Sequence, residues 1–179
     1  MRIAYADPPY IGQSKKHYGN HPDYAGEVDH EALIGQLVAD YPDGWALSCS
    51  SPSLRYLLPL CPADVRIAAW VKPFAVFKPN VNPAYAWEPV IWCGGRRQRS
   101  RDELTIRDWV SSVIVLQGGT HGTKPEPFCR WLFDLLGLDP DDTFDDLFPG
   151  SGAVARAWER WRTEPRLDVR VDGVQEALA

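Results

Sequence analysis

The sequence lacks several features that would assign it to a specialised class of protein. No apolar run approaches the roughly 18–20 residues of a membrane span. The segment Met1–Ala6 is too short and too soon interrupted for a secretory signal peptide. There is no basic excess, because 19 lysines and arginines stand against 24 acidic residues and the formal net charge is −5. Any contact with a nucleic acid must therefore be local.

The cysteines and histidines lack the spacing of a metal or disulfide framework. No C-x-x-C pair occurs, and the four histidines do not cluster with the cysteines. The four cysteines are Cys49, Cys61, Cys93 and Cys129. Scattered cysteines in apolar stretches are typical of buried free thiols in a reducing compartment. We therefore expect a cytoplasmic protein, of a bacterial or phage-infected cell, with no metal site and no membrane anchor.

The length and composition of the chain are typical of one globular domain. The chain has 179 residues, 45% of them hydrophobic, which supports one sizeable core. Most of the eight tryptophans are expected in that core. Strand-like runs alternate with helical patterns, which predicts an α/β fold with a largely parallel sheet. Strands are expected at residues 2–6, 45–49, 65–71, 85–93, 113–116, 143–148 and 167–171, and helices at 29–40, 51–58, 126–136 and 150–162.

A glycine turn follows the predicted strand at 143–148. Its sequence is Asp146-Leu147-Phe148-Pro149-Gly150-Ser151-Gly152. Glycines let a ligand approach the backbone, and ligands of open α/β sheets bind at this carboxyl edge. Asp172 lies 20 residues after Gly152, the spacing of an acidic residue that binds a ribose diol. The turn matches neither G-x-G-x-x-G nor a P-loop, so a nucleoside without a phosphate chain fits best; a plain packing turn is the alternative.

A second turn, Asp7-Pro8-Pro9-Tyr10, follows the first predicted strand on the same edge. The two prolines stiffen the backbone, hold the Asp7 carboxylate and the Pro8 carbonyl in fixed directions and present Tyr10 as a flat face. Two acceptors beside an aromatic plate suit a planar ring that bears an amino group, whose nitrogen is then aimed at an electrophile. A capped proline turn is the alternative, and the glycine turn on the same edge makes it the less favoured one.

The two turns resemble the motifs of the amino-methyltransferases, a family of adenine-N6 and cytosine-N4 enzymes. The catalytic motif (D/N/S)-P-P-(Y/F/W) is matched by residues 7–10, and the cofactor motif D-x-F-x-G-x-G by residues 146–152. The catalytic motif comes first, as in the permuted beta-type and MT-A70-like enzymes. Lys124-Pro125 is similar to the family's K-P segment, and Trp87–Trp92 to its strand with a central acidic residue. The resemblance extends from residue 2 to about residue 172.

This resemblance implies a Rossmann-like class I methyltransferase fold. We expect one three-layer α/β domain over residues 1–179, with a mostly parallel sheet that lacks one strand and no separate target-recognition domain. The implied activity is methyl transfer from S-adenosylmethionine to an exocyclic amine, with adenine N6 in DNA favoured because Asp holds the first motif position. The alternatives are RNA adenine N6, DNA cytosine N4, a non-catalytic cofactor- or nucleic-acid-binding subunit, and an unrelated α/β binding module whose motifs match by chance.

The resemblance also implies roles for individual residues. Asp7 and the carbonyl of Pro8 would orient the target amine, Pro9 belongs to the same catalytic turn, and Tyr10 would stack on a flipped-out base. Asp146 and Lys124 are expected at the methionine end of the cofactor, Phe148 in its pocket wall and Asp172 at its ribose. The full set expected to bind the cofactor is Asp146, Phe148, Gly150, Ser151, Gly152, Lys124 and Asp172.

Basic residues in two segments are the candidates for contact with the DNA or RNA substrate. They are Lys15 and Lys16, after the catalytic motif, and Arg96, Arg97 and Arg99 in a basic run. A solvated loop is the alternative for each segment. Only the segments at 74–83 and 94–107 have room to read a sequence, so specific recognition would need a homodimer or a recognition partner. Lys72 and Asn82 flank the expected pocket, and Trp70 and Trp87 are candidates for its walls.

Overall fold

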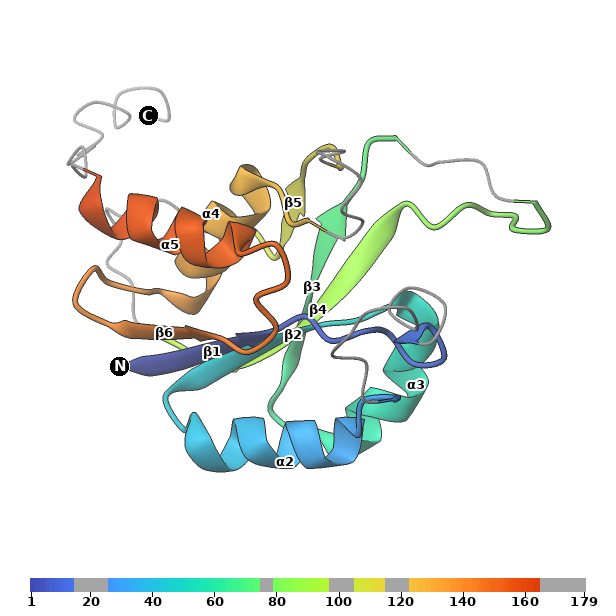
Figure 1. Ribbon diagram of the computed structural model, residues 1–179, viewed down its shortest axis with the longest axis horizontal. Helices are drawn as coiled ribbons and strands as arrows, with labels where there is room; N and C mark the ends of the chain where they lie inside the picture. Colours follow the sequence, from blue (N-terminus) through green and yellow to red (C-terminus); the bar gives the residue numbers. More distant parts are fainter. Residues whose placement is uncertain (15–25, 75–78, 97–104, 115–122, 165–179) are drawn as a thin grey trace, which may run out of the picture.

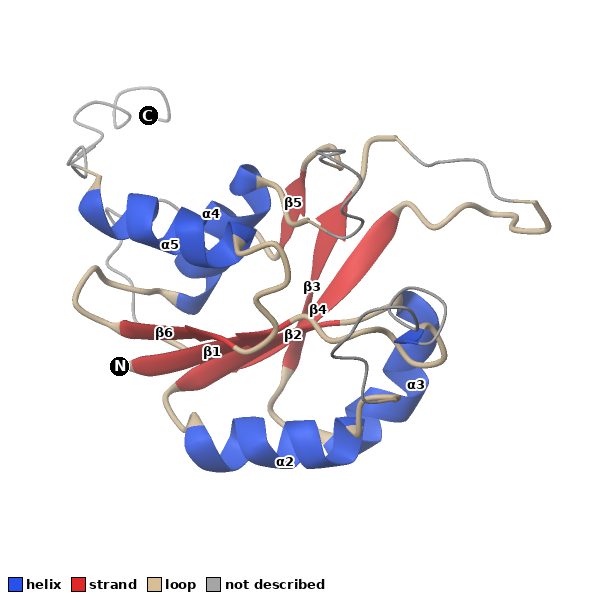
Figure 2. Cartoon of the chain, in the orientation of Figure 1, coloured by secondary structure: helices blue, strands red, loops and turns tan. Residues whose placement is uncertain are grey.

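The computed structural model describes residues 1–14, 26–74, 79–96, 105–114 and 123–164. These residues form one sheet between two layers of helices (Figure 1, Figure 2). Helices α4 (Glu126–Leu136) and α5 (Ala153–Thr163) cover one face, and α2 (His30–Asp40) and α3 (Leu54–Leu57) lie on the other. The predicted three-layer α/β architecture is confirmed.

The described strands form a six-stranded sheet in the order β5-β3-β4-β2-β1-β6. Their bounds are β1 Arg2–Ala6, β2 Gly44–Ser48, β3 Arg66–Val71, β4 Trp87–Gly94, β5 Trp109–Ser111 and β6 Thr143–Asp146. β1 is parallel to β2 and β6, and β3 is parallel to β5. β4 is antiparallel to both of its neighbours, β2 and β3. The sheet is mostly parallel, as predicted, and β4 begins at the edge where the other strands end.

Aromatic rings join the layer of α4 and α5 to the sheet. The ring centroid of Phe133 lies 5.1 Å from that of Phe144 and 5.3 Å from that of Trp158, which stacks on Trp161 at 5.2 Å. Such pairs contribute about 0.5–1.5 kcal/mol each beyond the area they bury. Six of the eight tryptophans are buried, which confirms that most of them serve the core: Trp45, Trp70, Trp92, Trp131, Trp158 and Trp161.

Helix ends follow the capping signals of the sequence. The carboxylate of Asp29 accepts a hydrogen bond from the Ala32 N–H at 3.0 Å and caps α2. Helix α4 ends at Gly137, whose φ of +63° favours glycine, and the Leu138 N–H bonds back to the Phe133 carbonyl at 3.0 Å. The helix predicted at 126–136 is confirmed at both ends.

Two predicted elements differ from the structure. The segment predicted as a helix at 51–58 is helical, but only α3 is α-helical; Ser51–Ser53 and Leu58–Leu60 on either side of it are 3₁₀ helices, each of which contains a proline without an N–H. The strand predicted at 113–116 is wrong at Val113 and Ile114, the two of its residues that are described. The edge strand is β5, which pairs with β3 instead. The strand predicted at 167–171 lies outside the described residues.

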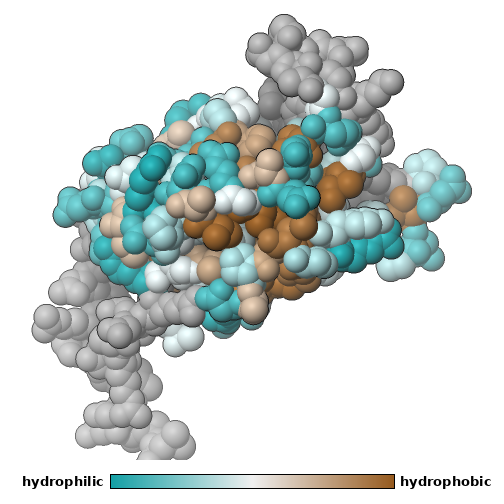
Figure 3. All heavy atoms as spheres, turned by 90° about the horizontal axis from the view of Figure 1, so that it is seen from below, coloured by the Kyte–Doolittle hydropathy of each residue, from teal (hydrophilic) through white to brown (hydrophobic). Residues whose placement is uncertain are grey.

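The layer of α2 and α3 covers its sheet face incompletely. Ile67, Trp87 and Trp109 share this face by register and are 42%, 40% and 43% exposed. Viewed from below, the molecule exposes apolar side chains among hydrophilic ones (Figure 3). Within the described part of the chain, none of the helices combines the length and the apolar character that a bilayer crossing needs.

Candidate active site at the carboxyl edge of the sheet

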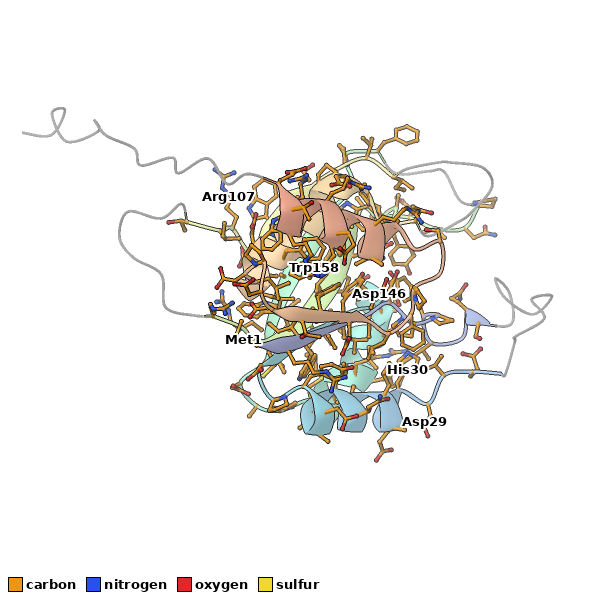
Figure 4. The ribbon with its side chains drawn as sticks, turned by 60° about the vertical axis from the view of Figure 1, so that its left-hand side comes forward. Met1, Asp29, His30, Arg107, Asp146 and Trp158 are labelled. Atoms are coloured by element: carbon orange, nitrogen blue, oxygen red, sulfur yellow. The ribbon has the colours of Figure 1, made fainter. Side chains whose placement is uncertain are left out.

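Five charged side chains gather where the parallel strands end. Asp7 follows β1, Asp146 ends β6 and Lys72 follows β3. Glu88 joins them from the beginning of β4, because this strand is antiparallel and starts at the same edge. Lys124 precedes α4. Figure 4 shows Asp146 among the side chains at this end of the sheet.

Lys124 connects two of the carboxylates. Its Nζ lies 3.0 Å from Asp7 Oδ1 and 3.1 Å from Glu88 Oε2, and its side chain is 4% exposed. The ammonium also lies 5.2 Å from the ring centroid of Trp70 and 5.6 Å from that of Phe128. Burial alone would lower the pKa of Lys124, but the two carboxylates outweigh it and hold that pKa above its usual value. Lys124 is therefore a fixed cation at neutral pH.

Glu88 accepts hydrogen bonds from three groups. Its Oε2 accepts the hydroxyl of Tyr10 at 2.8 Å and also faces Lys124, while Oε1 is paired with Lys72. Burial would raise the pKa of Glu88, but Lys124 and Lys72 outweigh it and lower that pKa to about 2. The carboxylate is thus ionised across the physiological range.

Asp7 has a pKa above its ordinary value. Burial is the largest cause, and the ammonium of Lys124 offsets only part of the rise. Asp7 Oδ1 faces Lys124. A carboxylate held at one oxygen by an ammonium keeps the lone pairs of the other for a further donor. Asp7 is therefore suited to accept a hydrogen bond and then a proton.

Asp146 differs from these paired groups. Both of its carboxylate oxygens are buried and have no hydrogen-bond partner among the described residues. Burial raises the pKa of Asp146 to about 6; the nearby N–H of Phe148 offsets part of the rise, and the negative charge of Asp7 adds to it. An unpartnered buried carboxylate costs free energy, so a cationic group of a ligand would be stabilised here.

The charges of the site do not balance over the part of the chain that the structure describes. Asp7, Glu88 and Asp146 are three carboxylates, while Lys72 and Lys124 supply two ammonium groups. The unmatched negative charge is on Asp146 whenever that residue is ionised. The site as a whole therefore favours a ligand with a net positive charge.

The turn between β6 and α5 borders Asp146. Gly150 and Gly152 have φ angles of +44° and +71°, which favour glycine, and Gly152 is the N-cap of α5. A Cβ on Gly150 would meet no atom closer than 3.9 Å, so the glycine is required by its backbone angle and not by crowding. The space beside Gly150 is therefore open to a ligand, whereas the guanidinium of Arg156 lies beside Gly152 and donates to the Ser151 carbonyl at 2.9 Å.

The structure brings together the predicted residues of both turns. Pro8 is buried, Pro9 and Tyr10 are half-buried, and Phe148 packs against the core under α2. The hydroxyl of Ser151 lies 3.4 Å from that of Thr123, beside Lys124 in the chain. Lys124, which was expected at the methionine end of the cofactor, contacts Asp7 of the catalytic turn.

Other predicted residues are not at this edge or are not described. Asp172, Lys15, Lys16, Arg97 and Arg99 lie outside the described residues. Arg96 follows the end of β4 and thus lies at the opposite edge, where it is ion-paired with Asp142 and lies 3.1 Å from Asp139 Oδ2. Of the two tryptophans considered as pocket walls, Trp70 is buried beneath Lys72 and Lys124, and Trp87 is 40% exposed.

The predicted site residues do not include Glu88, and Lys72 is only placed beside the pocket. Two signals are available in the sequence: Glu88 is the acidic residue of the segment Trp87–Trp92 that resembles a family strand, and both residues are charged, Glu88 within an otherwise apolar strand and Lys72 at the end of one. A buried charge requires partners, so each position implies an opposite charge nearby. What the sequence does not reveal is the direction of β4, which brings Glu88 to the site.

Comparison with known proteins reveals similarity in structure only. No protein-family model matches the chain, and no curated protein is similar to it. The structure of M1.HpyAVI with SAM matches with a TM-score of 0.61 at 16% identity, over 90% of this chain and 78% of that one. A second structure of M1.HpyAVI matches with a TM-score of 0.58 at 17% identity, over 89% and 76%.

A third similar structure is TTHA0409 of Thermus thermophilus, which is named as a DNA modification methylase. It matches with a TM-score of 0.50 at 16% identity, over 90% of this chain and 77% of that one. The structural neighbours are DNA methyltransferases. The chain therefore has the Rossmann-like α/β fold of these enzymes, as predicted.

Proposed function

We propose that the chain transfers a methyl group from S-adenosylmethionine to an exocyclic amine of a nucleic-acid base, with adenine N6 in DNA as the favoured target. The observation that carries the proposal is that two carboxylates at the same edge of the sheet have different surroundings. Asp7 is held by Lys124 beside an aromatic face, whereas Asp146 is buried without a described partner next to a glycine turn. One suits a neutral amine, and the other suits a cation.

The residues present fit S-adenosylmethionine. At neutral pH the molecule carries a sulfonium, an ammonium and a carboxylate, so its net charge is positive. Asp146, whose buried oxygens have no partner among the described residues, would accept the ammonium. Gly150 and Gly152 would let the backbone approach the ligand. The solved SAM complex of M1.HpyAVI, a protein of the same fold, supports this donor.

The catalytic turn would orient the acceptor. S-adenosylmethionine supplies an electrophilic methyl group on its sulfonium. Asp7 and the Pro8 carbonyl would accept the two hydrogens of the amine, which directs the nitrogen lone pair away from the ring and toward the methyl carbon. The new N–C bond forms as the C–S bond breaks, and the sulfur keeps that electron pair. The excess proton then leaves the nitrogen for Asp7 or for water, and the raised pKa of Asp7 favours its role as acceptor.

Tyr10 supplies the flat surface that a base would stack on. Its hydroxyl donates to Glu88 at 2.8 Å, so the ring has a defined orientation. A base in a duplex is enclosed by its neighbours, and an enzyme that modifies its amino group must act on a flipped-out or single-stranded nucleotide. Stacking on such a ring is worth roughly 1–3 kcal/mol per base.

The experiment is a nucleoside analysis after methylation. The protein is incubated with methyl-labelled S-adenosylmethionine and with unmethylated DNA or RNA in separate reactions, and the digests are analysed by mass spectrometry. We expect labelled N6-methyldeoxyadenosine from DNA, and none from a reaction with Asp7→Ala. Label in N4-methylcytosine or in RNA would mean that the substrate is not adenine in DNA, while the proposed methyl transfer to an exocyclic amine would stand. No labelled nucleoside in either reaction, or full transfer by Asp7→Ala, would contradict the proposal.

A further inference from the structure

Glu88 is a charged residue in a place where strand residues are normally apolar. It is the second residue of β4, directly opposite Trp70 of β3 by register, and the two residues that follow it, Pro89 and Val90, are buried. The Glu88 side chain is 16% exposed. A carboxylate in such a position is costly unless several donors satisfy it. Three donors satisfy Glu88: the hydroxyl of Tyr10 and the ammonium groups of Lys72 and Lys124.

We propose that Glu88 is a positioning residue for methyl transfer, because its two oxygens fix both the ring of Tyr10 and the ammonium that orients Asp7. This inference rests on the proposed function. It adds a residue outside both sequence motifs and gives that residue a defined task. Glu88 itself touches neither the donor nor the acceptor.

The first contact of Glu88 determines the plane of the Tyr10 ring. Tyr10 lies outside any regular element, between the two prolines and the exposed turn that begins at Ile11. The hydrogen bond from its hydroxyl to Glu88 Oε2 at 2.8 Å restrains the far end of the ring. A hydrogen bond to an ionised acceptor is stronger than one between neutral groups. The ring is therefore held in one orientation before a base arrives.

The second contact of Glu88 determines the position of Lys124. The Nζ atom of Lys124 is shared almost equally between Asp7 Oδ1, at 3.0 Å, and Glu88 Oε2, at 3.1 Å. Lys72 pairs with the other oxygen, Oε1, so Glu88 is neutralised without withdrawing Lys124 from Asp7. Movement of Glu88 would move the ammonium and with it the carboxylate of Asp7.

Glu88 also sets the charge state of Asp7. Among the described residues, the charged and titratable groups that face Asp7 from the surrounding elements are Lys124, Lys72, Glu88, Asp146, Tyr5 and Tyr10. Glu88 raises the pKa of Asp7, whereas the two lysines lower it. Removal of the negative charge at position 88 therefore lowers the pKa of Asp7. Asp7 would then be ionised at lower pH but would be a weaker proton acceptor.

Three variants separate these effects. Glu88→Gln keeps an acceptor oxygen for Tyr10 and Lys124 but removes the charge. Tyr10→Phe keeps the ring and the charge at position 88 but removes the hydrogen bond. Glu31→Gln is the matched control, because Glu31 is an exposed carboxylate in the first turn of α2. Each protein is assayed for kcat against pH at saturating S-adenosylmethionine, so that titration of Asp146 does not affect kcat. The KM for S-adenosylmethionine is measured separately, at one pH, by varying the concentration of S-adenosylmethionine.

We expect kcat to fall about ten- to a hundredfold in Glu88→Gln and in Tyr10→Phe, because small displacements of reacting groups have effects of this size. The KM for S-adenosylmethionine should stay the same in both. The acidic limb of the kcat profile should shift to lower pH in Glu88→Gln and stay in place in Tyr10→Phe and Glu31→Gln. A structural role alone would lower the fraction of folded protein without moving this limb.

The failure of this inference is distinguishable from the failure of the proposed function. Wild-type transfer with an unchanged kcat and acidic limb in Glu88→Gln would overturn the positioning role and leave the methyltransferase intact. If no variant has activity, carbon-13 NMR titration of the Asp7 carboxylate in the wild type and in Glu88→Gln gives the answer directly. A lower pKa of Asp7 in the variant supports the inference, and an unchanged pKa overturns it.

Discussion

The two ends of strand β6 carry carboxylates with opposite properties. Asp142, just before the strand, is 3% exposed at its side chain and pairs with the N-terminal ammonium at 2.5 Å and with Arg96. Burial would raise the pKa of Asp142, but these donors outweigh it and hold that pKa far below its usual range. Asp146, at the other end, has buried oxygens without a described partner, and its pKa rises to about 6.

This difference separates a structural cluster from the proposed ligand site. At the Met1 end, Asp142, Arg96 and Arg2 are satisfied by partners within the chain, and Arg2 is paired with Asp145 at 2.8 Å. At the other end, one carboxylate lacks such a partner among the described residues. Native proteins rarely leave buried polar groups unsatisfied, and Asp146 is the one charged side chain among the unsatisfied groups of the described residues, which supports the proposal that a ligand pairs with it.

The largest effect expected from this comparison is on cofactor binding. Asp146→Asn should weaken the affinity for S-adenosylmethionine about a hundredfold at pH 8, because loss of one partner of a buried charge pair costs several kcal/mol. Isothermal titration calorimetry measures this affinity. Asp142→Asn is the matched control at the other end of the same strand and should bind normally. Equal affinities of Asp146→Asn and the wild type would remove Asp146 from the site.

The stability of the two variants should follow the reverse order. Asp142→Asn should lower the free energy of unfolding by about 2 kcal/mol, because Arg96 and the N-terminal ammonium lose a buried acceptor. Urea titration followed by tryptophan fluorescence gives this value. Asp146→Asn should show no such loss at pH 8. A comparable loss in both variants would mean that both carboxylates are structural.

The affinity for S-adenosylmethionine should depend on pH through Asp146. As the pH falls below about 6, the carboxylate is protonated in the free protein and can no longer pair with a cation. The affinity should fall about fivefold between pH 6 and pH 5, because the ionised fraction of Asp146 falls from about one half at the pKa to about one tenth one unit below it. Calorimetry at several pH values tests this dependence, which should be absent in Asp146→Asn. A flat profile in the wild type would exclude Asp146 as the titrating partner.

The smallest effect concerns the stability of the free protein. A carboxyl whose pKa is raised on folding keeps its proton in the folded state while the unfolded chain loses it, so stability falls as the pH rises from about 4 to about 6. Asp146→Asn removes this cost and should be about 1 kcal/mol more stable than the wild type at pH 8, after allowance for solvent screening. The difference should vanish near pH 4. Denaturation curves at pH 8 and pH 4 measure the sign of this stability difference and its disappearance at the lower pH.

The sequence predicts most of this architecture because local signals agree with the fold. The strand at 2–6 and the helix at 126–136 have the predicted bounds, since prolines follow the first and Gly137 ends the second. The segment around β5 has two competing apolar runs. Only the pairing of Trp109 with Ala69 of β3 decides between them, and that contact is not local in the sequence.

The candidate site is also predictable in part from local sequence signals. Asp7 and Asp146 lie in recognisable turns, so their common edge follows from a parallel sheet. Glu88 comes from β4, whose antiparallel direction no periodicity reveals, and its meeting with Lys124 depends on that direction. For Arg96 the local signal is misleading. Its neighbours in the sequence are basic and suggest a contact with nucleic acid, whereas in the fold Arg96 forms an ion pair with Asp142, which is distant in the sequence.

The most direct test compares methyl transfer by Asp7→Asn and Asp142→Asn, one variant at each end of the sheet. Both remove a single carboxylate, and both are assayed with labelled S-adenosylmethionine and unmethylated DNA at equal concentrations of folded protein. We expect Asp7→Asn to lose transfer by about a hundredfold or more, because the negative charge that stabilises the developing cation and accepts its proton is removed, and Asp142→Asn to retain it. Normal transfer by Asp7→Asn, or an equal loss in both variants, would contradict the assignment of the active site to the carboxyl edge.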